Sequence, residues 1–181
     1  MPSRALLTYL IISALVTSLV AADLDQEIKD ATVVQLHQPA PDFTCTTTDN
    51  RRFKLSELKG KVVLLYFFDR IPASCMTAMR EIQDEILPDL KKRADFVILG
   101  IGRGLTREEV VQLCGQSGIT FPLVADPKRE LCNPYFTRFM PRTVLVRKDG
   151  SIGFIANGYH EFQGIPRLQF ALNRELATQA P

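Results

Sequence analysis

Residues 62–83 read VVLLYFFDRIPASCMTAMREIQ: an apolar run, a short break, a single cysteine and then an amphipathic pattern. The run KVVLLYFF (61–68) is rich in β-branched and aromatic residues, and so is DFVILGIG (95–102). Continuous apolar runs of this kind are typical of strands that helices cover on both faces. We therefore predict that these two runs form neighbouring central strands.

A helix is predicted between these two strands. Four residues recur at helical spacing on its apolar face: Cys75, Met79, Ile82 and Ile86. Basic residues at 91–93 suit the C-terminal end of a helix, where the helix dipole is negative. A strand, a crossover helix and a second strand in one sheet predict a parallel pair.

Elements further along the chain complete the predicted sheet. TREEVVQLCGQSG (106–118) predicts a second helix, with Thr106 and Glu109 in capping-box register and Gly115 or Gly118 at its end. RTVLVRKDGSIGFIANG (142–158) predicts a hairpin that turns at Asp-Gly, and residues 162–176 fit a last helix. The predicted fold class is α/β, with a central mixed sheet and helices on both faces.

The N-terminus, MPSRALLTYLIISALVTSLVAADLDQE, has the pattern of an export signal. One arginine precedes an apolar run over 5–20, and small residues follow at 20–22. The alternative is an uncleaved membrane anchor, because residues 5–22 approach the length of a bilayer crossing. We predict a signal peptide at 1–22, an N-terminal extension at 23–39, one domain at 40–177, and an exported product that is periplasmic or secreted.

Composition excludes several functions. The chain has 181 residues, 46% of them apolar, with a formal net charge of +2 and no basic block. One domain is therefore expected, with no nucleic-acid partner. Two distant histidines and no closely spaced cysteine pair make a metal site unexpected. Export places an even number of cysteines in an oxidising compartment, where pairing is permitted: Cys45, Cys75, Cys114 and Cys132.

Four stretches carry a resemblance to a known family: APDFTC (40–45), FKLSELKGKVVLLYFF (53–68), GITFPLVADPKREL (118–131) and MPRTVLVRKDGSI (140–152). The chain resembles the thioredoxin-like superfamily, in the branch shared by peroxiredoxins (alkyl hydroperoxide reductase/thiol-specific antioxidant) and exported thiol:disulfide oxidoreductases. The resemblance spans about residues 39–176 and implies a thioredoxin-like fold with no cofactor.

Two alignments within this branch disagree about Cys75. The peroxiredoxin pattern Pro-x-x-x-Thr-x-x-Cys falls on residues 68–75 and makes Cys75 the peroxide-attacking thiol, with Phe68 and Pro72 replacing the usual proline and threonine. The oxidoreductase pattern Trp-Cys-x-x-Cys falls on residues 71–75, and Pro72 then replaces the first, attacking cysteine.

The two alternatives for Cys75 also differ in where the helix begins. If Ser74 is the N-cap, Cys75 is the first helical residue, where unpaired N–H groups and the helix dipole favour a thiolate. If Pro72 is the first helical residue, Cys75 lies deeper in the helix and is shielded.

The resemblance implies roles for residues outside this stretch. A proline at the position of Pro141 is commonly cis and lies against the cysteine, and it would present the Met140 backbone to a peptide. Peroxiredoxins usually have an arginine at the position of Pro141, where it favours the thiolate form of the attacking cysteine. This chain lacks that arginine, so Arg142 or Arg138 would supply the positive charge. LCGQSGI (113–119) resembles the surroundings of a resolving cysteine, which suggests a Cys75–Cys114 disulfide; a structural Cys114–Cys132 disulfide is the rival.

The predicted function is an exported, peroxiredoxin-like thiol peroxidase. Cys75 would attack the hydroperoxide, Cys114 or an external thiol would resolve the sulfenic acid, and Arg142 or Arg138 would stabilise charge. Ser74 could hydrogen-bond the thiolate, and substrate would contact Pro72, Ser74, Met140 and Pro141.

Two alternatives to the peroxidase remain. One is a disulfide reductase or isomerase that lacks the first cysteine of the pair, and the other is a non-catalytic thioredoxin fold that binds a peptide beside Pro141. The partners expected are a hydroperoxide or protein disulfide and an external thiol or thioredoxin-type electron donor. For the oligomeric state, a homodimer is one alternative.

Overall fold

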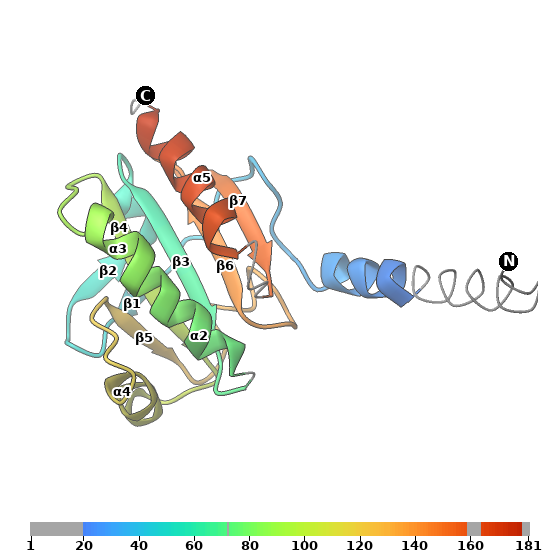
Figure 1. The fold of residues 1–181 in the computed structure, drawn as a ribbon, viewed down its shortest axis with the longest axis horizontal. Helices are drawn as coiled ribbons and strands as arrows, with labels where there is room; N and C mark the ends of the chain where they lie inside the picture. Colours follow the sequence, from blue (N-terminus) through green and yellow to red (C-terminus); the bar gives the residue numbers. More distant parts are fainter. Residues whose placement is uncertain (1–19, 72, 159–163, 179–181) are drawn as a thin grey trace, which may run out of the picture.

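The computed structural model describes residues 20–71, 73–158 and 164–178. Its central sheet has five strands in the order β5-β4-β3-β6-β7 (Figure 1). They are β3 (Val62–Phe68), β4 (Phe96–Arg103), β5 (Leu123–Asp126), β6 (Arg142–Val146) and β7 (Ile152–Asn157). β3, β4 and β5 are parallel neighbours, whereas β3–β6 and β6–β7 pair antiparallel. The predicted mixed sheet, with its two neighbouring central strands, is confirmed.

The crossover between β3 and β4 is the predicted helix. It consists of α2 (Ser74–Glu81), a π-helical segment η2 (Ile82–Ile86) and α3 (Leu87–Leu90). All four residues predicted on its apolar face are buried. Pro88 follows the π-helical segment, and its missing N–H is consistent with an interruption of the regular hydrogen-bond pattern there.

The remaining helices lie close to their predicted positions. α4 (Arg107–Gly115) has the predicted capping box, because the Thr106 hydroxyl accepts from the Glu109 amide and the Glu109 carboxylate accepts from the Thr106 amide. The helix ends at Gly115, the first of its two predicted ends. α5 (Gly164–Ala177) covers most of the predicted last helix, whose expected start at Phe162 lies outside the described residues.

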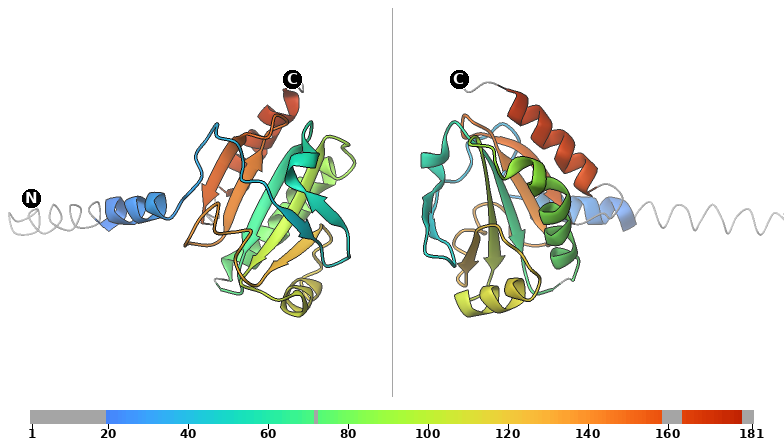
Figure 2. Two further views of the ribbon diagram at one scale, coloured as in Figure 1. Left: turned by 180° about the vertical axis from the view of Figure 1, so that it is seen from behind. Right: turned by 60° about the vertical axis from the view of Figure 1, so that its left-hand side comes forward.

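The alternation of β3 side chains divides the core in two. Leu64, Tyr66 and Phe68 pack beneath α2–α3 and α5, in a cluster that includes Cys75. Val63, Leu65 and Phe67 pack on the other face. That face is covered by the hairpin β1 (Thr44–Thr46) with β2 (Arg52–Lys54), the short helix η1 (Leu55–Leu58) and residues 131–136 (Figure 2). The fold is therefore thioredoxin-like α/β, as predicted.

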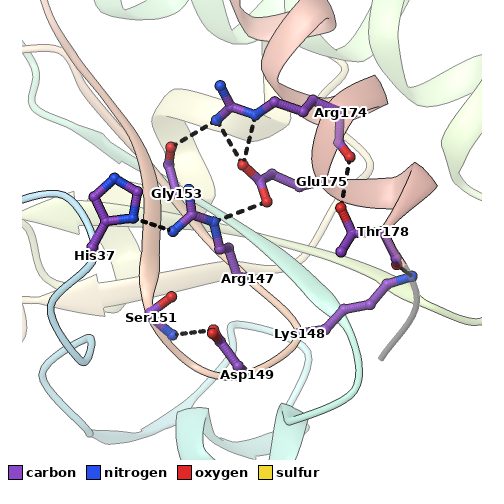
Figure 3. A network of polar contacts seen from close by, with 9 residues as sticks. All are labelled: His37, Arg147, Lys148, Asp149, Ser151, Gly153, Arg174, Glu175 and Thr178. Carbon is purple, nitrogen blue, oxygen red and sulfur yellow. Dashed lines mark hydrogen bonds and ion pairs between the residues drawn. The ribbon is translucent and has the colours of Figure 1, made fainter. Parts of the chain in front are cut away.

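The segment before the predicted domain start also packs on the sheet. Thr32 bridges Phe136 and Pro39 bridges Ser151. Figure 3 shows a polar network in which Arg147 contacts His37 Nδ1 at 2.8 Å and donates to the buried Glu175 carboxylate at 2.9 Å. This network joins the N-terminal segment to the β6–β7 hairpin and α5. The boundary at residue 40 stays a prediction.

A further helix over residues 20–30 projects away from the sheet (Figure 1). Among residues 20–71, 73–158 and 164–178, no helix has the length and apolarity that a bilayer crossing requires. Most of the predicted signal peptide, residues 1–19, lies outside the described residues.

Candidate functional site

Cys75 lies where the carboxyl ends of β3 and β4 meet the start of α2. The register between β3 and β6 pairs Phe67 with Arg142. The loop after β3 and the loop before β6 therefore leave the sheet side by side. The second loop contains a cis Met140–Pro141 peptide bond, as the resemblance implied. Pro141 is buried, and the half-buried Met140 packs against the cluster that contains Cys75.

Helix α2 begins at neither of the two positions considered from sequence. Its first residue is Ser74, and its N-cap is Ala73, whose carbonyl accepts from the amides of Met76 and Thr77 at 3.0 and 3.2 Å. Cys75 is therefore the second helical residue. The N-cap residue Ala73 makes no side-chain hydrogen bond. The suggested hydrogen bond from Ser74 to a thiolate stays a prediction. Pro72 lies outside the described residues.

The Cys75 thiol is shielded and held in its neutral form. Its exposed fraction is 0%, and burial raises the pKa of the thiol above its ordinary value. A backbone hydrogen bond from Asp69 lowers this pKa, and the negative charge of Asp69 raises it. The Tyr66 hydroxyl donates to the Cys75 carbonyl at 2.6 Å and fixes the first turn of α2. A neutral, buried thiol reacts slowly until the site opens.

The other cysteines are also buried free thiols. Cys114 belongs to the same cluster as Cys75, with its Sγ 4.0 Å from Met79 Sδ, and burial raises the pKa of this thiol to about 11. Cys132 belongs to the cluster on the opposite face, where its amide donates to Asp126. The sheet therefore separates the two members of the rival Cys114–Cys132 pair. The structure contains neither suggested disulfide.

Arg142 is not brought together with Cys75. Its exposed fraction is 1%, and its guanidinium stacks over Phe136 on the face of the sheet opposite Cys75. It donates to the carbonyls of Phe139 and Arg138 at 2.9 Å each, to Thr32 Oγ1 at 2.8 Å and to Asn157 Oδ1. Burial lowers the pKa of this guanidinium to about 10.

Successive strand residues point to opposite faces, so the start of β6 directs Arg142 away from the cysteine site. Arg138 is exposed and lies over Phe139. Of the two arginines proposed from sequence to stabilise charge, Arg142 is already engaged by other groups. A role for Arg138 stays a prediction.

Sequence reasoning missed two polar residues beside the site. Asp69 follows β3, and Arg103 ends β4; Arg103 Nη1 lies 4.0 Å from Asp69 Oδ2, and Arg103 Nη2 donates to the Thr137 carbonyl at 2.7 Å. Arg103 thus joins the loop after β3 to the loop before β6. The carboxyl ends of neighbouring parallel strands lie at the same edge of a sheet. Asp69 and Arg103 each stand directly at the end of a predicted strand, and that position could have identified them as site residues.

A metal site is not apparent. Within the ranges that the structure describes, no group of three or more histidine, cysteine, aspartate or glutamate side chains could hold a metal ion.

Comparison with known proteins places the chain in a family. Residues 36–155 match the model of the AhpC/TSA family. The thiol-disulfide oxidoreductase ResA of Geobacillus kaustophilus is 30% identical over 138 residues, covering 76% of this chain and 78% of that protein.

Solved structures agree with this placement. The chain resembles a candidate protein disulfide isomerase from Bacteroides thetaiotaomicron, with 32% identity, a TM-score of 0.77, and coverage of 82% of this chain and 94% of that one. A candidate thiol:disulfide interchange protein DsbE from Chlorobium tepidum shares the fold at 19% identity, with a TM-score of 0.72 and coverage of 80% and 99%. The chain therefore belongs to the AhpC/TSA family of thioredoxin-like proteins.

Proposed function

We propose that this protein is a thiol-disulfide oxidoreductase that uses one cysteine, Cys75, and needs an external thiol to complete each turnover. The observation that carries the proposal is the position of Cys75 in the first turn of α2, directly after the central strand β3 and beside the Met140–Pro141 loop. None of the other three cysteines lies in that loop-to-helix junction.

The proposed reaction is an exchange of disulfides. The Cys75 thiolate attacks one sulfur of a substrate disulfide, forms a mixed disulfide with it, and releases the other sulfur as a thiolate. An external thiolate then attacks the substrate sulfur of the mixed disulfide. This step frees Cys75 and leaves a disulfide between the substrate and the external thiol, so that the electrons balance. Without a second thiol at position 72, the chain does not supply the releasing group itself.

The relatives support this reaction better than peroxide reduction. The ResA relative is named as a thiol-disulfide oxidoreductase, and the Bacteroides structure as a candidate disulfide isomerase. A peroxide-attacking cysteine works as an exposed thiolate with a cation nearby. Arg142, which the peroxidase prediction assigned to that charge, lies on the face of the sheet opposite Cys75.

The burial of Cys75 adds a requirement to the mechanism. The thiol must become accessible before exchange, so the loops that contain Ala73 and Met140 must move apart when substrate binds. Protein disulfides are the substrates that we propose, with a small thiol or a thioredoxin-type protein as electron donor. The apolar leader pattern of residues 5–20 supports export to a compartment where such disulfides form.

The test is isomerisation of scrambled ribonuclease by the full chain in a buffer of reduced and oxidised glutathione. We expect Cys75→Ser to abolish the catalysed rate. Cys114→Ser is the matched control, because its thiol is equally buried in the same cluster, and we expect it to retain the rate. Equal activity of the Cys75→Ser variant and the parent chain would rule out the proposal.

A second candidate is a thioredoxin fold that binds a partner peptide without chemistry. The complete burial of Cys75 and the presence of Pro72 at the attacking position favour it. In that case Cys75→Ser would leave partner binding unchanged, and the parent chain would show no isomerisation above the buffer rate.

A further inference from the structure

The first half of β4 lacks a strand partner on one side. β4 pairs with β3 from Phe96 onward, but β5 pairs only with Gly100–Arg103 (Figure 1). β1 and β2 form a separate two-stranded sheet. Within the described ranges, therefore, no strand adjoins residues 96–99 on the β5 side.

The direction of the backbone groups on this edge follows from the pairing. The Gly100 amide donates to the Pro122 carbonyl, so Gly100 directs its backbone groups toward β5. Ile98 has the same parity and directs its N–H and C=O the same way, past the end of β5. An unpaired strand edge of this kind is a template for another strand.

A cavity of about 510 Å³ opens along this edge. Residues 96–98 line it together with two aromatic side chains, Phe53 from β2 and Phe121 from the segment before β5. The cavity therefore combines free strand backbone with apolar pockets beside it. This combination fits an extended peptide, which supplies backbone donors and acceptors together with alternating side chains. A small apolar ligand would leave the strand edge unpaired.

The charged residues that line this cavity are both basic. Arg51 and Lys91 line it, and no acidic residue does. Arg51 pairs with Asp49 at 2.7 Å, but both side chains are about half exposed, so water screens this pair. Gln83 also lines the cavity, but its side chain is already engaged by Gly118 and Thr120. An occupant with a carboxylate is therefore favoured.

We propose that this edge binds an extended, acidic segment of a partner protein by strand addition beside Phe96–Leu99. Alternate apolar side chains of the segment would enter the cavity, and an acidic side chain would lie near Lys91 and Arg51. This surface is at the amino ends of β3 and β4, whereas Cys75 lies at their carboxyl ends. The proposal does not rest on the cysteine chemistry.

The probe is a fluorescein-labelled peptide, Thr-Val-Ser-Phe-Thr-Glu, whose valine, phenylalanine and glutamate fall on one face of a strand. Binding to the full chain is measured by fluorescence anisotropy. The matched probe has the same side chains and carries N-methyl groups on the two alternate amides that would pair with β4. We expect it to bind at least about tenfold more weakly, because each lost hydrogen bond costs about 1 kcal/mol.

The matched protein variants are Lys91→Glu and Lys92→Glu. Both side chains are exposed, but only Lys91 lines the cavity. We expect Lys91→Glu to weaken binding about fivefold and Lys92→Glu less than about twofold. No binding at millimolar peptide, equal affinity of the N-methylated probe, or equal effects of the two lysine variants would each overturn the proposal.

Discussion

Cys75 and Arg142 are two fully buried, chemically capable side chains on opposite faces of the central sheet. Arg142 has four hydrogen-bond acceptors from three separate segments, whereas no side-chain hydrogen bond is found for the Cys75 sulfur in the described structure. The arginine is committed to holding loops together. The cysteine is shielded by apolar packing and one backbone hydrogen bond from Asp69, which a bound substrate can displace.

The largest effect expected from this difference is on stability. Arg142→Met should lower the free energy of unfolding by about 3 kcal/mol, because several buried acceptors lose their donor at about 1 kcal/mol each. Urea unfolding measures the change. The matched control is Arg138→Met, an exposed arginine in the same loop, for which we expect less than about 0.5 kcal/mol. Equal losses in the two variants would mean that the Arg142 contacts contribute little.

Alkaline pH should lower the stability of the parent chain more than that of a variant without the Cys75 thiol. Burial raises the pKa of the Cys75 thiol above 9.0. The buried neutral thiol therefore contributes fully to stability below pH 9. This contribution is lost as the pH rises through the folded-state pKa. Between pH 8 and pH 10 the parent chain should lose more stability than Cys75→Ala, because the unfolded thiol ionises first.

Urea unfolding at both pH values checks this difference. Cys114→Ala serves as a reference, because burial raises the pKa of that thiol to about 11 and a reduction in pH dependence in the same direction is expected. Identical pH dependence of the parent chain and Cys75→Ala would contradict a raised pKa for Cys75.

A smaller change tests the connection of Arg142 to the N-terminal segment. Thr32→Val keeps the shape of the side chain and removes the hydroxyl that accepts from Arg142. We expect a loss of about 1 kcal/mol in urea unfolding. Thr32→Ser keeps the hydroxyl and should stay closer to the parent chain; an equal loss in both variants would point to packing of the methyl group instead.

The smallest effect is expected at the helix start. The N-cap of α2 is Ala73 and Ser74 is its first helical residue, so Ser74→Ala should change the free energy of unfolding by less than about 0.5 kcal/mol. A loss above about 1 kcal/mol would indicate that the hydroxyl caps α2 after all.

The features that sequence predicted are those that local patterns determine. The apolar runs of β3 and β4, the helical spacing from Cys75 to Ile86 and the Thr106–Glu109 capping box each depend on neighbouring residues, and all are confirmed. The thioredoxin-like fold followed from their order.

The site was less predictable, because its decisive contacts join distant parts of the chain. Arg142 is bound by Thr32, which lies 110 positions away. The start of α2 at Ser74 differs by only a residue or two from the alternatives, yet it decides the environment of Cys75. The unpaired edge of β4 arises from the short length of β5, which the apolar pattern of β4 does not report.

The most direct test of the central claim is the site of mixed-disulfide formation. The reduced, folded full chain is incubated with oxidised glutathione, and intact mass and peptide mapping locate the adduct. The account predicts one glutathione adduct, on Cys75, which a small thiol removes, while Cys45, Cys114 and Cys132 remain unmodified. An unmodified Cys75, or adducts that appear on all four cysteines at the same rate, would contradict it.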